Sequence, residues 1–189
     1  MTAFKELDGP DGPVYDGSRP LAGVIGSLTA GTGITAGVDT VYVSEVRQDG
    51  MIVKTTIFID LTGLNSGGAD GDIIGKNSTA NCHLGQITTA LNGVIFRGSI
   101  ACAKTPTGGE PDIDVYSAVE ATGTEDAAVS GLTERALLAA AADWTKGAQK
   151  NLTATPAAGE YLYLVASGGV TDATYTAGQF VIELWGVKV

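Results

Sequence analysis

The sequence has 189 residues, of which 21 are acidic and 11 are basic, so its formal net charge is -10. A chain this acidic is poorly suited to a nucleic-acid backbone, because those contacts need clustered lysine and arginine. No stretch approaches about 18 consecutive apolar residues, so we expect no membrane-spanning helix. The first residues lack the basic and apolar regions of a signal peptide. The single histidine excludes a metal site built from several histidines.

The composition favours an all-β protein. Charged residues make up 17% of the chain and 27 residues are glycine, whereas a typical charged share is about 25%. Long helices supported by ion pairs between successive turns need more lysine and glutamate than this. Short strands joined by glycine-rich turns fit the composition better.

Residues 1–37 are interpreted as an extended N-terminal arm. Pro10 and Pro13 cannot donate to a strand ladder and lie among turn-forming dipeptides. The apolar residues of this segment are too few for a core of their own, and we expect them to contact a partner: Leu21, Val24, Ile25 and Leu28. A disordered terminus is the alternative. The remaining residues, 38–189, are expected to form one β-sandwich domain.

Residues 38–61 predict a β-hairpin. Asp49-Gly50 separates two runs rich in β-branched and aromatic residues, and both residues tolerate the positive φ that a tight turn requires. The second run alternates with a period of two, which is typical of a strand with one buried face. Its two faces are Met51, Val53, Thr55, Ile57, Ile59 and Leu61, against Ile52, Lys54, Thr56, Phe58 and Asp60.

Further strands follow a long loop at 62–80. They are expected at about 82–89, 93–104, 113–119, 148–154, 160–167 and 178–187. In the second of these, the residues expected to share a face are Val94, Phe96, Ile100 and Cys102. Leucine and alanine at 132–142 favour a short helix, with a strand of small residues as the alternative. About eight strands and one helix indicate a β-sandwich of the jelly-roll type.

Cysteine and histidine give no catalytic or metal signature. Cys82 and Cys102 lack the spacing of a zinc site, and we expect both to be reduced and buried. Adjacent residues on a strand point to opposite faces, so Cys82 and His83 should not form a nucleophilic pair. We predict no catalytic residues, no metal and no cofactor.

Four carboxylates stand close together in pairs, at Asp70 and Asp72 and at Asp112 and Asp114. Neither pair has the spacing of a calcium-binding loop, so solvated turn residues are the favoured interpretation. A glycosidase would need two such groups about 5–9 Å apart in a cleft, which the sequence leaves open.

The aromatic residues predict an interface rather than a ligand site. Aromatic side chains in strands usually form cores or cross-strand pairs, although Trp144 and Trp185 could also line a sugar-binding surface. Both faces of the strands at 160–167 and 178–187 are apolar, which exceeds the needs of a small core. The residues expected at a protomer interface are Tyr161, Tyr163 and Trp185.

The C-terminal half resembles the capsid decoration, or cement, proteins of tailed bacteriophages. The resemblance covers about residues 90–189, and its residues are those at 111–118, 123–127, 132–134, 144–147, 156–165 and 176–186. They are strand and turn patterns without a catalytic motif, so no functional residue carries over. The resemblance implies a jelly-roll core, a homotrimer on the outer surface of the shell and an arm that reaches neighbouring subunits.

These observations lead to one expected function and two alternatives. The first is a virion structural protein, made in the cytoplasm of the bacterial host, that binds the major capsid protein and itself but neither nucleic acid nor membrane. Many weak contacts, multiplied by symmetry, would provide its avidity. The second is a glycan- or receptor-binding β-sandwich of a phage head fibre or tail. The third is an enzyme acting on a polysaccharide through Asp112 or Asp114.

Overall fold

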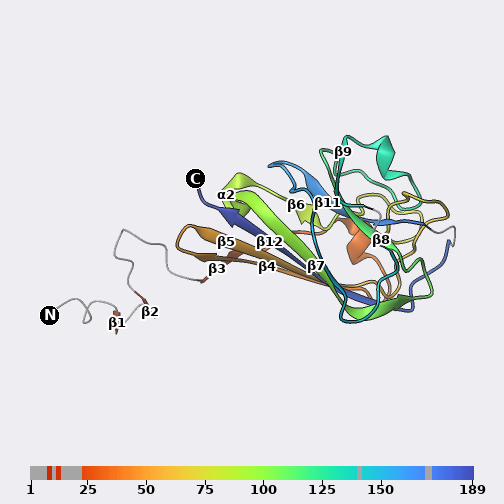
Figure 1. The fold of residues 1–189 in the computed structure, drawn as a ribbon, viewed down its shortest axis with the longest axis horizontal. Helices are drawn as coiled ribbons and strands as arrows, with labels where there is room; N and C mark the ends of the chain where they lie inside the picture. The colour runs from red at the N-terminus through yellow and green to blue at the C-terminus, as the bar shows by residue number, and fades with distance from the viewer. Residues whose placement is uncertain (1–7, 10–11, 14–22, 140–141, 169–171) are drawn as a thin grey trace.

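The fold is a sandwich of two antiparallel β-sheets (Figure 1). The computed structural model describes residues 8–9, 12–13, 23–139, 142–168 and 172–189. The strands of the larger sheet are, in spatial order, β10 (Gln149–Asn151), β7 (Val94–Thr107), β12 (Ala177–Val187), β5 (Ile52–Asp60), β4 (Val41–Asp49) and β3 (Gly23–Gly26). The smaller sheet contains β6 (Gly85–Gln86), β11 (Tyr161–Ala166), β8 (Ile113–Ala118) and β9 (Glu134–Leu138).

Short elements complete the description. Strands β1 (Asp8–Gly9) and β2 (Gly12–Pro13) pair with each other near the N-terminus. The helical turns are α1 (Thr32–Thr35), α2 (Thr89–Asn92) and a 3-10 turn, η1 (Val129–Gly131).

The pairing of strands β5 to β12 is that of a jelly roll. The first of these eight strands pairs with the last, β5 with β12, and the second pairs with the second-last, β6 with β11. Strands β7 and β10 pair next, and β8 and β9 pair at the centre of the sequence. Such nested pairing is produced when one long antiparallel ribbon is rolled into two sheets of four strands. The expected jelly-roll sandwich is therefore confirmed, and β4 and β3 widen one of its sheets.

The predicted hairpin forms as β4 and β5. Asp49 pairs with Ile52, which leaves a two-residue loop whose first residue, Gly50, has a φ of 59°. Positive φ at this position is what two-residue hairpin turns require. The predicted inward face of β5 is buried from Val53 to Leu61, while Met51 in the loop is exposed.

The main core lies between the two sheets. Trp144 and Phe180 pack edge to face, with ring centroids 5.5 Å apart, and the indole nitrogen of Trp144 donates a 2.8 Å hydrogen bond to the carbonyl of Ile113. Burying a ring of this size contributes strongly to stability, and the hydrogen bond satisfies its only polar atom. A smaller cluster around Ile73 and Tyr163 lies beside the main core.

Residues 23–37, assigned to the arm from the sequence, form part of the sandwich. Strand β3 pairs with β4 at the edge of the larger sheet. Leu28 is 6% exposed and Ile34 is fully buried in the main core. The hydroxyl of Ser44 bonds to both the amide and the carbonyl of Leu28. The boundary at 37/38 therefore does not separate arm from core, because these side chains are needed to complete that core.

The helix predicted over 132–142 is wrong. Residues 134–138 instead form strand β9, which pairs with β8, and both Leu137 and Leu138 are buried. The packing of these leucines against the sheet outweighs the helix preference of the alanines that follow. Residues 140–141 lie outside the described residues.

Candidate interaction surface

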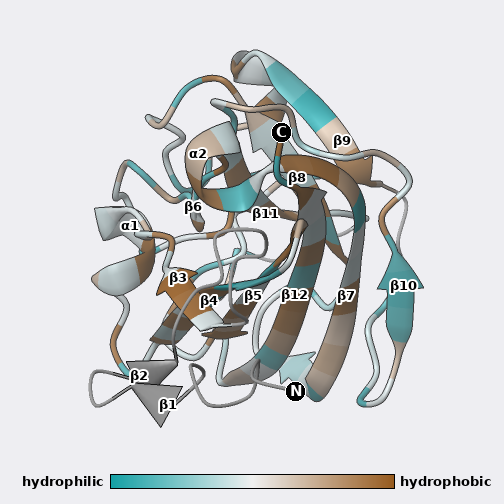
Figure 2. Ribbon diagram, turned by 90° about the vertical axis from the view of Figure 1, so that its left-hand side faces the viewer, coloured by the Kyte–Doolittle hydropathy of each residue, from teal (hydrophilic) through white to brown (hydrophobic). Residues whose placement is uncertain are grey.

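The larger sheet has one face that is not packed against the smaller sheet. Side chains alternate along β5, so that Val53, Ile57 and Ile59 are buried while Ile52 is exposed. On β4, Val43 is 56% exposed. We call this side of β4, β5, β12 and β7 the outer face. Figure 2 shows hydrophobic residues along β12 and β7.

Strand register arranges the outer face in rungs that cross four strands. Each rung contains the residues that pair in the order β4, β5, β12 and β7. The first apolar rung is Val43, Phe58, Val181 and Ala101; the acidic rung is Glu45, Thr56, Glu183 and Ser99; the basic rung is Arg47, Lys54, Trp185 and Arg97; the second apolar rung is Asp49, Ile52, Val187 and Val94. A terminal rung of Val41, Asp60, Gln179 and Lys104 precedes them.

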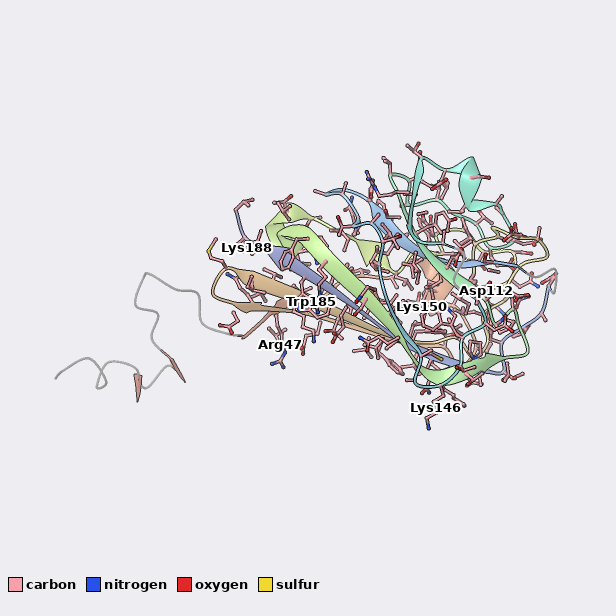
Figure 3. The ribbon with its side chains drawn as sticks, in the orientation of Figure 1. Arg47, Asp112, Lys146, Lys150, Trp185 and Lys188 are labelled. Carbon is pink, nitrogen blue, oxygen red and sulfur yellow. The ribbon has the colours of Figure 1, made fainter. Side chains whose placement is uncertain are left out.

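Trp185 is the centre of the basic rung. The Arg97 guanidinium lies 4.2 Å from its ring centroid and the Lys54 ammonium 5.4 Å from it. Cations at these distances are attracted to the negative face of the indole ring. Figure 3 shows Trp185 and Arg47 in the same region of the sheet. The ring is thereby held in place on a surface that remains partly open to solvent.

Ion pairs join the acidic rung to the basic rung. The Lys54 ammonium lies 2.5 Å from a carboxylate oxygen of Glu183, and Arg47 pairs with Glu45 on the same strand. Across all five rungs, the bases are Arg47, Lys54, Arg97 and Lys104, and the acids are Glu45, Asp49, Asp60 and Glu183. Four charges of each sign give the outer face no net charge, whereas the whole chain carries -10.

A shallow depression lies beside Trp185, at the edge of the outer face next to β3. Its volume is about 310 Å³, and its lining residues are Gly23, Arg47, Gln48, Asp49, Ile52, Lys54 and Trp185. It borders Gly23, the first residue of β3.

The residues predicted for arm contacts fall into different environments. Val24 is 56% exposed and Ile25 is 41% exposed on β3, with Val24 paired to Arg47 of the basic rung. Leu28 is buried in the core and has little surface to offer a partner. Leu21 lies outside the described residues.

The three residues predicted for a protomer interface do not meet. Only Trp185 lies on the outer face. Tyr163 is fully buried, its hydroxyl donates a 2.7 Å hydrogen bond to the carbonyl of Glu120, and burial raises its pKa to about 12. Tyr161 is partly buried on the other sheet, where its ring lies 4.8 Å from that of His83. The hydroxyl of Tyr163 is thus hydrogen-bonded inside its own protomer.

Cys82 and Cys102 are free and buried, as predicted. The thiol of Cys82 donates to the carbonyl of Thr79, and burial raises its pKa to about 12. A buried neutral thiol of this kind is a poor nucleophile. Nδ1 of His83 has no hydrogen-bond partner among the described residues, and burial lowers the pKa of this histidine.

Three of the four named carboxylates hold loops in place, and the fourth, Asp114, lies in strand β8. Asp72 accepts hydrogen bonds from the amides of Gly68 and Ala69, and Asp70 accepts one from Gly168. Asp112 accepts one from Ala142. Asp114 is buried at 3% exposure. Within the described ranges, no three His, Cys, Asp or Glu side chains are grouped so as to hold a metal ion.

The cations of the outer face were not predicted from the sequence. Lys54 could have been found, because it lies on the predicted solvent face of the hairpin strand, between Ile52 and Thr56. Its alignment with Arg47 follows from the hairpin, whereas its alignment with Trp185 and Arg97 depends on pairings between strands more than 80 residues apart in sequence. No local pattern signals such a pairing.

Comparisons with known proteins returned no family, no curated protein and no solved structure that matches the chain. Within the described residues, every helix is too short or too polar to span a bilayer.

Proposed function

We propose that this protein is a virion structural protein that binds the outer surface of a phage capsid as a trimer and stabilises the shell. Its partners would be the major capsid protein and copies of itself. It would be made in the host cytoplasm and reside on the capsid exterior. The observation that carries the proposal is the jelly-roll pairing of β5 to β12, and apolar side chains that the described residues leave partly exposed on the outer face support a role in association.

The fold supports this assignment by analogy. Jelly rolls recur in viral capsid proteins and also in lectins, and a fold alone does not identify a function. The resemblance to decoration proteins covers about residues 90–189 and rests on strand and turn patterns. The jelly-roll pairing of β5 to β12 agrees with it.

The exposed apolar residues support an association role more directly. Ile52 and Val94 are each nearly half exposed and lie in the second apolar rung, and Val43, which is 56% exposed, lies in the first. Isolated exposed apolar residues are ordinary, but gathered ones indicate an interaction site. Val24, which pairs with Arg47 of the basic rung, continues this surface at its edge.

Deletion of residues 1–22 tests the capsid contact of the arm. This deletion keeps β3, Leu28 and Ile34, which the core requires. Purified protein would be added to shells that lack it, and occupancy would be measured by sedimentation and gel. We expect occupancy to fall at least tenfold while circular dichroism and thermal unfolding stay unchanged. Equal occupancy of the shortened and full-length proteins would remove residues 1–22 from the capsid contact.

Glycan binding is the second candidate function, and the depression beside Trp185 favours it. Sugars stack on exposed aromatic rings, and Gln48 and Asp49 could supply polar contacts in the same depression. The two cations that already lie over the indole ring compete with such stacking. A glycan array would show binding that Trp185→Ala abolishes if this function holds, and a blank array would dismiss it.

A further inference from the structure

We propose that the outer face pairs with the outer face of a second copy of this chain, about a two-fold axis that runs parallel to the rungs. The axis would pass between the acidic rung and the basic rung. This contact would occupy the outer face, so the three-fold association and the contact with the shell in the proposed function would use other surfaces of the protomer. With both contacts the assembly would contain six copies, and with the pairing alone it would contain two.

The order of the rungs is the main argument for a second copy. Along the strands the rungs run apolar, acidic, basic, apolar. Rotation about the proposed axis reverses this order in the second copy, so the acidic rung meets the basic rung and the two apolar rungs meet each other. The exception to the apolar match is on β4, where Val43 faces Asp49. Glu45 then faces Arg47 of the second copy, and Phe58 faces its Ile52. A two-fold interface must be complementary to itself in this way.

The other two-fold arrangement is excluded by charge. If the axis ran along the strands between β5 and β12, each rung would face itself with the strand order reversed, so Arg47 would meet Arg97 of the second copy and Lys54 would meet its Trp185. Like charges facing one another cost several kcal/mol and suppress a pairing. The rung pattern therefore selects one orientation, in which strands of the two copies run antiparallel and pack as aligned sheets.

Because the outer face carries no net charge, a second copy is repelled less there than at other parts of this acidic surface. Two chains of charge -10 repel each other, but the outer face carries four charges of each sign. The pairs Lys54–Glu183 and Arg47–Glu45 already compensate one another within a protomer. Trp185 would lie near the middle of the contact, where tryptophan and arginine contribute most to binding energy.

The area of the face is sufficient for a stable contact. Four strands about 4.8 Å apart, each contributing about nine residues at about 3.4 Å, span roughly 600 Å² in projection. Side-chain relief makes the accessible area larger than the projected area. A standard interface buries about 800 Å² per partner, so the outer face matches the size that a specific complex needs.

Charge reversal on β4 tests the pairing. Arg47→Glu places two acids in one column of the face, and Glu45→Arg places two bases there. For each variant alone, the dissociation constant of the pair should be at least tenfold higher than for the wild-type chain, as measured by analytical ultracentrifugation. An equal mixture of the two variants should recover the pair, because opposite charges then face one another between copies.

Controls separate this result from misfolding and from charge in general. The double variant, with both substitutions in one chain, should pair like the wild type, since reversal of both signs preserves complementarity. Lys146→Glu changes the net charge equally but lies far from Arg47 (Figure 3), and it should leave the mass unchanged. Thermal unfolding would verify that every variant is folded.

Three outcomes would overturn the pairing: a wild-type mass of one or three copies, an Arg47→Glu variant that associates as the wild type does, or a mixture that fails to recover. A monomer that loses shell binding or glycan binding on Arg47→Glu would assign the face to that ligand instead. A wild-type protein that pairs but never binds shells would leave the pairing intact and remove the proposed function.

Discussion

At the scale of single residues, the position of Asp112 destabilises the folded protein when its carboxyl group is ionised. Burial, together with the nearby Asp114, raises its pKa to about 6. The folded chain therefore binds this proton more tightly than the unfolded chain, whose Asp has a pKa near 4. The contribution of Asp112 to the free energy of unfolding should fall as the pH rises from about 4 to about 6, and this loss should persist above pH 6.

Asp112→Asn is accordingly expected to stabilise the protein at neutral pH. The amide oxygen of Asn can still accept the hydrogen bond from Ala142, and the variant has no charge to desolvate. After allowance for partial exposure to solvent, we expect a gain of about 1–2 kcal/mol at pH 7, shrinking towards zero at pH 4. Urea unfolding across this range measures it.

The exposed Asp39→Asn is a matched control for this experiment and should change stability by less than about 0.5 kcal/mol at either pH. A gain at Asp112→Asn that did not depend on pH would contradict the assigned cause.

Tyr163 shows why interface residues were hard to choose from sequence. Tyr161 and Tyr163 share one face of β11 by alternation, yet Tyr163 is enclosed by the smaller cluster while Tyr161 is only partly covered. The loop that contains Gly123 covers Tyr163, and the amide of Gly123 donates a hydrogen bond to the Tyr163 hydroxyl. A loop that returns over a strand leaves no periodic signal in that strand.

At the scale of elements, the hairpin of β4 and β5 was predictable because all of its signals are local. A turn dipeptide, a period of two and β-branched residues agree with one another. Strand β9 was not predictable in this way, since its strand character comes from pairing with β8. In β7, a register shift lies between the pairs of Trp185 and Gly186. It places Ile95 in the core and leaves Phe96 exposed, contrary to the predicted common face.

Gly50→Ala tests the hairpin turn. The glycine has a φ of 59° and an added methyl group would meet no atom within 4 Å. The cost therefore comes from the left-handed backbone alone, about 1 kcal/mol. Chemical denaturation measures this loss.

Gly131→Ala is the matched control for the turn, because it also has open space around it but no positive φ. It should have little effect. Equal losses at the two sites would show that the turn conformation is not what Gly50 provides.

At the scale of the whole molecule, composition and alternation were enough to predict an all-β sandwich, and the count of strands suggested its jelly-roll type. The arm boundary was misplaced because Leu28 and Ile34 enter the core from a glycine-rich stretch without periodicity. The outer face could not be predicted, since its rungs combine strands from both ends of the chain. Surfaces of this kind arise only from the complete topology.

The mass of the full-length chain in solution tests the central claim, which is that this molecule works by associating with copies of itself. Multi-angle light scattering at micromolar concentration would measure it. The account predicts six copies of the 19.1 kDa chain, about 115 kDa. Two copies would keep the pairing without the trimer, and three would keep the trimer without the pairing. A mass of 19.1 kDa at every concentration would contradict both.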